Sequence, residues 1–370
     1  MKIIYYYSGY SSNMSGWQKV NFIDELSNNG HEIILVSMND YVDAQIKNDK
    51  IRADITLYQP DLFMTSCDDS TLTSDFLSVI KQASIPSLLI CFDNLSVPFK
   101  HRKCCSMFDL VWLTSVETQH IFRAWGAKTI FLPYASNPNV YKPTDGDELP
   151  TVSFVGTCYG VRKRKIESLL DHNIPVKLFG GNNTSSEQHN PARNVIKNLS
   201  ESTLMVANLM RFDIGRKSLV GAIKKSFIQK DSHGNVKFNE LQSERKSLSF
   251  ENMIDVYSRS AISLGVTELW NTYLLKEPIH KIHLRCFEIP MSGGIQLVTK
   301  TDEIASYFME DSEAIYYGCE DEMIDKCKFY LQDDKSTIRE KIKENARKRS
   351  LASHTWMHRF NNVFSELKLK

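Results

Sequence analysis

KIIYYYSGYSSNMSGWQKVNFIDELSNNGHEIILVS, residues 2–37, decides the fold class. The apolar run Ile3–Tyr7 is typical of a buried strand, and the small, polar residues 8–16 are typical of a loop. Residues 17–29 place apolar side chains at helical spacing, and Gly30 then ends the helix. Ile33–Val36 is a second apolar run of the kind that parallel sheets bury on both faces. The stretch therefore predicts a strand–helix–strand unit.

Units of the same kind follow along the first part of the chain. The pattern predicts helices over 72–83 and 117–125, and strands over 53–58, 85–92, 108–113 and 129–133. Strands that alternate with helices across short connections indicate a doubly wound α/β sheet.

A break at 137–150, which contains three prolines, separates this series from a second one. The pattern restarts with strands predicted over 151–155, 175–179, 261–266 and 295–298. Residues 200–250 are read only in outline, as helical over 201–229 and turn-rich over 231–235. We therefore expect an N-terminal domain (1–147), a C-terminal domain (148–350) and a terminal helix (351–370) that packs back on the N-terminal domain. Two such halves predict a ligand-binding cleft between the carboxyl ends of two parallel sheets.

The composition excludes several classes of protein. The 45 Lys and Arg residues nearly balance the 44 Asp and Glu residues, so a net charge of +1 provides no field that would recruit nucleic acid, and membrane contact is at most peripheral. No apolar run reaches the length of a membrane helix. None of the eight cysteines forms a CxxC pair, and no signal peptide is expected before the first strand. We therefore expect reduced thiols and a cytoplasmic protein.

The clearest chemical motif is HLRCFEIPMSGG, residues 283–294. Glu288, on the first turns of a short helix, could accept hydrogen bonds from the paired hydroxyls of a ribose or sugar. Arg285 adds a planar cation suited to a phosphate, and backbone N–H groups at the start of the helix could bind a pyrophosphate. The motif therefore points to a ligand that contains both a sugar and phosphate.

In this region the sequence resembles the spore-maturation-protein-B-like (CgeB-like) glycosyltransferases, which belong to the group 1 glycosyltransferases of the GT-B fold. Their Arg-x-Phe-Glu stretch and small-Gly-Gly turn are matched by Arg285–Glu288 and Ser292–Gly294. The strand and loop at 152–162, the run from 108 to Tyr141-Lys142-Pro143 and the closing segment 354–360 resemble the same family. The resemblance covers nearly the whole chain except about 200–250.

One position departs from the family pattern. Group 1 enzymes often carry two glutamates separated by seven residues, and the second corresponds to Glu288. The first would fall at His280, which is not an acid. Contacts to the donor sugar through that position are therefore not expected here, and the identity of the sugar stays open.

The resemblance implies a role for each of the other motif positions. Glu288 is expected to bind the ribose of a nucleotide, and Arg285 and Arg162 are expected to face its diphosphate. Gly156, and Gly293 after the helix, are expected to allow close approach of the donor. Fixed cations and N–H dipoles can stabilise a leaving diphosphate without a metal. The resemblance therefore implies a metal-independent enzyme whose donor is a nucleotide-diphosphate sugar and which needs no further cofactor.

The prediction of an acceptor site depends on one residue. Asp93 follows the strand predicted over 85–92 and is expected to face the cleft, where it could take the acceptor's proton in an inverting reaction. A retaining reaction would not need this base, so the stereochemical outcome stays open.

Each candidate also has a purely structural explanation. Glu288 could cap a helix, Asp93 could be a turn residue, and Arg162 could belong with Lys163–Lys165 to a solvated helix face. His101–Lys103 is interpreted as an exposed loop.

The favoured hypothesis is a glycosyltransferase that transfers a sugar to a glycan or other surface-polymer acceptor. Two alternatives stay open: a nucleotide-sugar epimerase of the same fold, and a non-catalytic binding module that has kept the fold.

Overall fold

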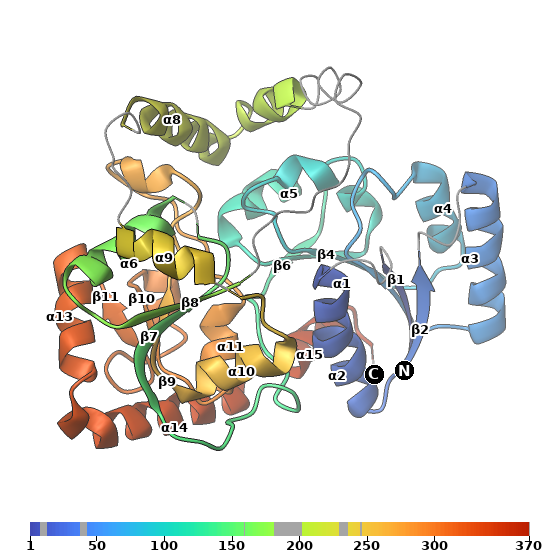
Figure 1. Ribbon diagram of the computed structural model, residues 1–370. Coiled ribbons are helices and arrows are strands. Elements are labelled where there is room, and N and C mark those ends of the chain that lie inside the picture. Colours follow the sequence, from blue (N-terminus) through green and yellow to red (C-terminus); the bar gives the residue numbers. More distant parts are fainter. Residues whose placement is uncertain are drawn as a thin grey trace. The chain divides into compact units, whose positions relative to one another are not determined.

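The computed structural model describes residues 1–7, 13–37, 43–158, 160–180, 202–228, 236–244 and 246–369. It consists of two compact units (Figure 1). Unit 1 comprises Met1–Val140 and His354–Lys370, and unit 2 comprises Tyr141–Ser353. The division at 147/148 stays a prediction.

Unit 1 contains a sheet of six parallel strands in the order β2-β1-β3-β4-β5-β6. The strands are β1 (Lys2–Tyr7), β2 (Glu32–Ser37), β3 (Leu62–Thr65), β4 (Ser87–Cys91), β5 (Leu110–Leu113) and β6 (Thr129–Phe131). The buried runs in β1, β3, β4 and β5 explain why the sequence shows no polar alternation there.

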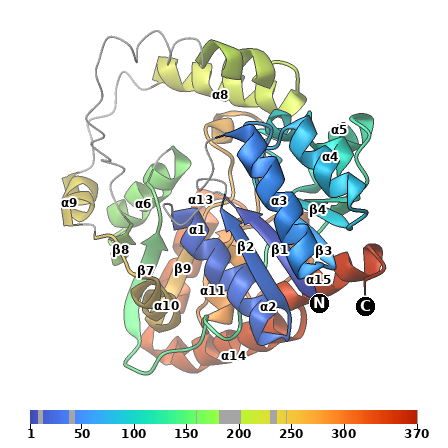
Figure 2. The same ribbon diagram turned by 90° about the vertical axis from the view of Figure 1, so that its right-hand side faces the viewer.

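Helices cover both faces of this sheet (Figure 2). Their bounds are α1 (Asn13–Gln18), a π-helical turn (Lys19–Ile23), α2 (Asp24–Asn28), α3 (Ala44–Tyr58), α4 (Ser74–Gln82), α5 (Gln119–Ala124) and α15 (Trp356–Glu366). Three 3-10 turns complete the unit: Pro98–His101, Cys105–Met107 and Val116–Thr118. Ile4 and Tyr6 of β1 share one core with Phe76 of α4 and Phe122 of α5. Tyr5, between them in β1, contacts Phe22 on the other face.

The strand predicted over 53–58 is wrong, because these residues form the end of α3. Asp43 caps this helix by accepting hydrogen bonds from the backbone N–H groups of Gln45 and Ile46. The apolar residues at 53, 55 and 57 imitate the alternation of a strand, but Leu57 is 71% exposed. Ile51 is buried and Ile55 packs against the same core, at the four-residue spacing of a helix. The strand lies instead at Leu62–Thr65.

The terminal helix α15 packs on unit 1, as predicted. Trp356 lies within a cluster of aromatic rings, with ring centroids 5.3 Å from Trp17 and 4.8 Å from Phe22. Its indole N–H donates to Asn21 Oδ1 at 2.9 Å. The guanidinium of Arg359 donates to the backbone carbonyl of Pro133. These contacts attach the end of the chain to the first unit.

Unit 2 contains five parallel strands in the order β11-β10-β9-β7-β8. They are β7 (Leu149–Val155), β8 (Val176–Phe179), β9 (Ser260–Gly265), β10 (Gln296–Thr299) and β11 (Ile315–Tyr317). The helices are α6 (Val161–Asp171), α8 (Asp213–Ile228), α9 (Val236–Glu244), α10 (Phe250–Arg259), α11 (Arg285–Met291), α12 (Asp302–Ala305), α13 (Glu320–Tyr330) and α14 (Ser336–Ser353), with 3-10 turns at Thr272–Leu274 and Asp333–Lys335. Two doubly wound parallel sheets confirm the predicted fold class.

The two sheets share a feature that locates ligand sites. The chain extends each sheet first to one side and then to the other, so the strand order reverses between β1 and β3 and between β7 and β9. In open α/β sheets, ligands bind beyond the carboxyl ends of the strands at such a switch point.

Helix is present within 202–228, as predicted, while the turn-rich stretch 231–235 lies outside the described residues. No helix among the described residues is long and apolar enough to cross a membrane.

We predict that Trp356→Ala lowers the free energy of unfolding by about 3–5 kcal/mol, because it leaves a cavity among the aromatic rings and removes the partner of Asn21. Chemical denaturation measures the change. Trp356→Phe keeps most of the packing and should cost less. Asn361→Ala, on the exposed side of the same helix, should be nearly neutral. Equal losses for Trp356→Ala and Asn361→Ala would contradict the packing described here.

A second prediction concerns Glu25 of α2. This residue is buried, and burial raises the pKa of its carboxyl to about 7 because it disfavours the charged form. The folded state binds this proton more tightly than the unfolded chain, so the stability contributed by the protonated carboxyl is lost as pH rises from about 4.5 to about 7. Glu25→Gln should therefore stabilise the protein by up to roughly 3 kcal/mol at pH 8 and very little at pH 4. Denaturation at both pH values tests this, with Glu32→Gln, at the exposed first residue of β2, as the control that should gain nothing.

Candidate functional site

The carboxyl end of β7 is built around a close approach of two backbones. Gly156 follows β7 with a φ of +140°, a conformation that residues with a side chain rarely adopt. Its N–H donates to the carbonyl of Phe179 at 2.9 Å. A Cβ on Gly180, after β8, would lie 2.9 Å from the carbonyl oxygen of Gly156. The absence of a side chain at Gly180 therefore lets the chain segments after β7 and β8 approach each other beside the switch point of unit 2.

Arg285, the first residue of α11, reaches this position. A Cβ on Gly156 would lie 2.6 Å from Nη2 of Arg285, so the guanidinium rests directly against the glycine backbone. The guanidinium also lies over the ring of Phe154, 5.6 Å from its centroid. Its Nη1 is buried and has no hydrogen-bond partner among the described residues. The structure thus brings together two of the predicted site residues and leaves a cationic donor there unsatisfied.

Arg162 adds a second cation near the same place. It is the second residue of α6, it is buried, and its Nη1 donates to the carbonyl of Thr157 at 3.1 Å. The interpretation of Arg162–Lys165 as a solvated face is therefore wrong for Arg162. The residue before α6 is Gly160, which has no side chain to cap the first N–H groups of the helix. The N-terminus of α6 thus offers backbone donors beside a buried cation.

His283 shows how concentrated the positive charge is. Burial lowers the pKa of His283 well below its usual value, and the charges of Arg285, Lys281 and Arg162 lower it further. The imidazole is therefore neutral near pH 7. Because three cations act on one ring, this part of unit 2 is electrostatically suited to an anion.

Glu288 is held by a residue that the motif did not identify. Its Oε1 accepts a hydrogen bond from the hydroxyl of Tyr141 at 2.7 Å, and both side chains are buried. Gly293, at the end of α11, has a φ of +75°. A Cβ there would lie 2.9 Å from Pro143. The structure therefore places Glu288 and Gly293 against the segment that contains Tyr141 and Pro143. The contacts of Glu288 and Gly293 with a ligand stay predictions.

A buried ionic network at the same edge of the sheet was missed from the sequence. Lys165 of α6 forms an ion pair with Glu268, and its Nζ also donates to the hydroxyls of Thr299 and Tyr317. Burial alone would lower the pKa of Lys165, but the neighbouring Tyr317 and Glu268 raise it, so the ammonium stays charged. The interpretation of Lys165 as part of a solvated face is wrong. Its neighbour Arg164 is exposed, so the run of cations at the start of α6 does not show from sequence that Lys165 is buried.

The position of the absent acid lies beside this network. His280 pairs with Glu268 in an antiparallel bridge, and its Nδ1 lies 2.8 Å from the hydroxyl of Thr267. Burial lowers the pKa of His280, although the carboxylate of Glu268 acts in the opposite direction. A carboxylate is thus present next to position 280, but it belongs to Glu268, earlier in the chain, and is paired with Lys165.

Asp93 lies in a separate pocket of unit 1. This pocket has a volume of about 450 Å³ and lies at the carboxyl ends of β3 and β4. Asp93 and Lys100 are exposed, whereas His101 is buried. Its lining also includes Gln18, Ser66, Cys67, Asp68, Ser70, Thr71, Phe92 and Val97. The pocket therefore has the location expected of a ligand site and contains the predicted acceptor residue.

His101 is a functional candidate that the sequence interpretation missed. Its Nδ1 is buried without a hydrogen-bond partner among the described residues. Burial lowers the pKa of His101, while Asp68 and Asp69 act in the opposite direction. A neutral imidazole at this place can accept a proton. The expectation of an exposed loop at His101–Lys103 is wrong for His101, which the preceding 3-10 turn directs inward.

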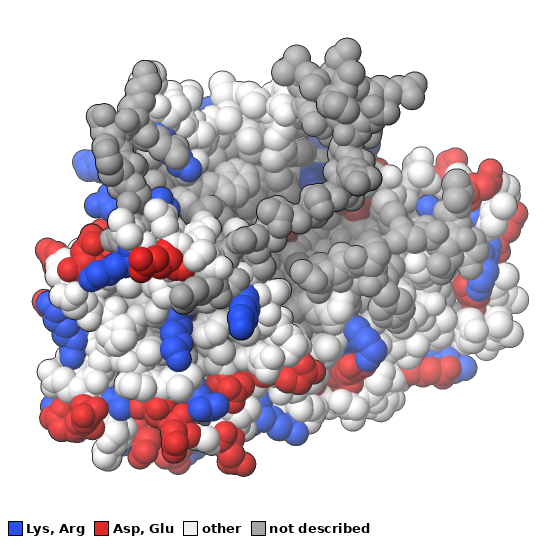
Figure 3. Space-filling model, viewed as in Figure 1, with Lys and Arg blue, Asp and Glu red and all other residues white. Residues whose placement is uncertain are grey.

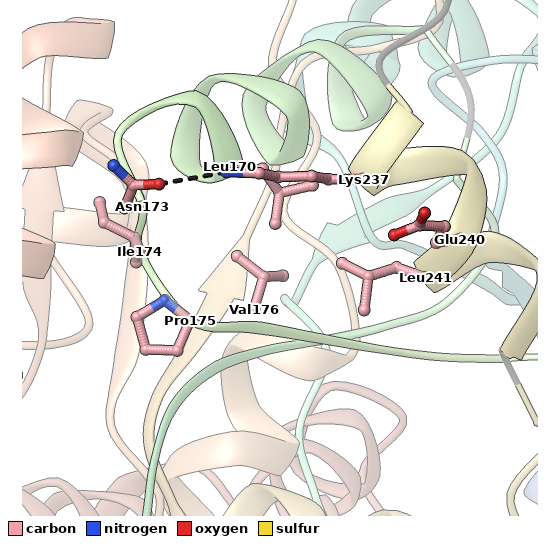
Figure 4. Close-up of a pocket in the computed structure, with 8 residues that line it drawn as sticks. All are labelled: Leu170, Asn173, Ile174, Pro175, Val176, Lys237, Glu240 and Leu241. Carbon is pink, nitrogen blue, oxygen red and sulfur yellow. Dashed lines mark hydrogen bonds between the residues drawn. The ribbon is translucent and has the colours of Figure 1, made fainter.

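A second pocket lies where a ligand site is not expected. It has a volume of about 380 Å³ and lies between α9 and the start of β8 (Figure 4). Apolar side chains of Ile174, Val176 and Leu241 line it, and Lys237 Nζ donates to Asn173 Oδ1 at 3.1 Å. This is the amino end of β8, whereas ligands of open sheets bind at carboxyl ends. Among the described residues, no group of three His, Cys, Asp or Glu side chains has the arrangement of a metal site.

Comparison with known proteins identifies the fold. Residues 216–365 match a family described as glycosyl transferase-like, a range that contains Arg285 and Glu288. No curated protein matches the chain. Among solved structures, Anabaena HepE in complex with UDP-glucose is similar at a TM-score of 0.57 and 13% identity, with 100% of this chain and 99% of that chain covered.

Two further structures agree with this. A glycosyltransferase from Rickettsia africae has a TM-score of 0.56 at 11% identity, and sucrose-phosphate synthase from Thermosynechococcus elongatus has a TM-score of 0.55 at 12% identity. Each comparison covers 99% of this chain and 98% of the other. The chain therefore has the GT-B fold, and residues 216–365 match a glycosyl transferase-like family.

Proposed function

We propose that this protein is a glycosyltransferase that takes a sugar from a nucleotide-diphosphate donor bound by unit 2. The observation that carries the proposal is Arg285, whose guanidinium lies against Gly156 with a buried, unsatisfied Nη1. The site lies at the switch point of a parallel sheet and within a region that matches a glycosyl transferase-like family. The complex of HepE with UDP-glucose makes a UDP-sugar the first donor to test.

The chemistry follows from where charge develops. When the glycosidic bond breaks, the leaving diphosphate gains negative charge. Arg285, Arg162 and the first N–H groups of α6 are fixed in position before the reaction, so they can stabilise that charge without reorganising. In this proposal the protein's own cations stabilise the leaving diphosphate, and transfer needs neither a metal ion nor another cofactor.

Glu288 has the proposed role of ribose acceptor. A carboxylate can accept several hydrogen bonds, and the hydroxyl of Tyr141 donates one of those that Glu288 accepts. Tyr141 fixes the orientation of the carboxylate. This role, together with the Arg285–Glu288 stretch, is also what supports the finer assignment to the CgeB-like glycosyltransferases.

The acceptor has its proposed place in the pocket of unit 1. A polar pocket that contains Asp93, Asp68 and His101 suits a hydroxyl-rich ligand, and a glycan or surface polymer is the proposed acceptor class. Asp93 is the proposed base of an inverting reaction, and His101 is a second group able to take the proton. The eight cysteines are all free thiols, which supports the cytoplasm as the proposed location.

The donor site is tested by calorimetric titration with UDP. Arg285→Gln should raise the dissociation constant about 10- to 100-fold, because it removes a charged hydrogen bond to the diphosphate. Arg164→Gln is the matched control, since Arg164 lies on α6, 65% exposed, and pairs with Glu320. Unchanged UDP affinity in Arg285→Gln would refute the donor site.

A second arm of the same titration addresses Glu288. The wild-type protein should bind UDP more tightly than its 2′,3′-dideoxy analogue, and Glu288→Gln should reduce that preference while leaving a hydrogen-bond acceptor for Tyr141. An equal preference for UDP over the dideoxy analogue in both proteins would show that Glu288 does not bind the ribose. Release of sugar from UDP-glucose above background, with water as the acceptor, distinguishes an enzyme from a binding module.

The acceptor base is tested by the rate of that release as a function of pH. Asp93→Asn should lower kcat by about 100-fold or more without changing UDP affinity. His101→Gln should do so only if His101 is the base, and the wild-type rate would then rise with pH below the usual pKa range of histidine. Full activity in both variants would exclude both residues as the base and favour a reaction in which the leaving phosphate takes the proton.

A further inference from the structure

Helix α8 attaches to unit 2 along one face. Ser218 and Gly221 are buried, and a Cβ on Gly221 would lie 2.6 Å from the backbone carbonyl oxygen of Asn271. Lys224 Nζ donates to the carbonyl of Leu274 at 3.5 Å. Both views show the loop around Thr272–Leu274 between α8 and the strands of unit 2 (Figures 1 and 2). The packing face of α8 is therefore centred on Ser218 and Gly221.

The opposite face of the helix is apolar and exposed. Val220, Ile223 and Phe227 follow the i, i+3, i+7 spacing of one helical stripe, and they are 46%, 58% and 78% exposed. The short helix at 202–209 and the residue after it add Leu204, Val206 and Met210, all exposed as well. Single exposed apolar residues are normal, but a stripe of three on the face of α8 opposite its contacts with unit 2 indicates an interaction surface.

Cations flank this stripe. At 100° per residue, Arg216 falls within the arc of Ile223 and Phe227 and Lys217 falls beside it, whereas Lys224 donates to the carbonyl of Leu274. Within 202–228 five cations stand against the single carboxylate of Asp213, a net charge of +4. The whole chain carries +1, so the rest of it carries −3. In the lower part of Figure 3, away from α8, basic and acidic side chains are interspersed. The positive charge is thus concentrated on the segment that also exposes apolar side chains.

We propose that α8 binds an anionic lipid surface, with Val220, Ile223 and Phe227 at the acyl boundary and the flanking cations among the headgroups. Charge complementarity favours this occupant. A second copy of the chain would bring one +4 segment against another in a symmetric contact, which like charges oppose. A nucleic acid would use the cations but would leave the apolar stripe in water. This surface lies outside the donor site and does not depend on the proposed activity.

Sedimentation with lipid vesicles tests the proposal on the full chain. Wild-type protein should bind vesicles of phosphatidylcholine with about one third phosphatidylglycerol, bind pure phosphatidylcholine much more weakly, and be released by salt. The double variant Ile223→Ser, Phe227→Ser should lose binding by at least about tenfold. Lys217→Gln should weaken it about fivefold.

The control is Leu57→Ser, which removes an equally exposed apolar side chain from α3 of unit 1. It should bind vesicles as the wild type does, and all variants should melt at the wild-type temperature because the changed side chains are exposed. No binding of wild-type protein to anionic vesicles would overturn the proposal, as would equal loss in Leu57→Ser. A wild-type dimer in sedimentation velocity that Ile223→Ser, Phe227→Ser dissociates would assign the surface to a second copy. Salt-sensitive binding to DNA that survives this double variant, without vesicle binding, would assign it to nucleic acid.

Discussion

The close contact between the Arg285 guanidinium and the backbone of Gly156 is the constraint on which the candidate donor site depends. It requires a residue without a side chain at the end of β7, in a backbone conformation that favours glycine. It also requires α11 to begin where Arg285 can reach that glycine. Phe154 then supports the guanidinium from within the sheet. A change at either residue would alter the geometry of both, because they occupy adjoining space.

The parallel sheet explains why these residues meet although they are distant in sequence. Parallel strands all end at one edge, so the segments after β7, β9 and β10 converge there regardless of their separation along the chain. The network of Lys165, Glu268 and Thr299 arises in the same way, from α6 and the ends of β9 and β10. Unit 1 repeats the arrangement with Asp93 and Asp68 in one pocket at the ends of β4 and β3. The fold supplies positions, and the residue types supply the chemistry.

The fold class could be predicted from the sequence because strands buried on both faces leave continuous apolar runs. The strand predicted over 53–58 is wrong because the apolar residues at alternate positions there belong to a helix. The start of that helix is set by Asp43, ten residues earlier. Arg285 and Glu288 could be found because they lie within one short motif. Tyr141 and His101 could not be assigned roles from sequence, because their significance comes from what they contact in three dimensions. Lys165 shows the same limit: a run of four cations does not reveal which of them turn inward.

Lys165, which is buried, and Arg285, which is partly buried, illustrate how a structural charge differs from one prepared for a ligand. Burying a charge is costly unless it is paired and hydrogen-bonded. Lys165 meets this condition within the protein, since Glu268, Thr299 and Tyr317 accept from its ammonium group. Arg285 meets it only in part, because the Tyr257 hydroxyl is a hydrogen-bond partner, but no carboxylate among the described residues forms an ion pair with Arg285 and its Nη1 has no partner there. An anion bound beside Gly156 would supply both the missing charge and the missing acceptor. The unsatisfied Nη1 of Arg285 is therefore the physical reason to place the donor phosphates there and not at Lys165.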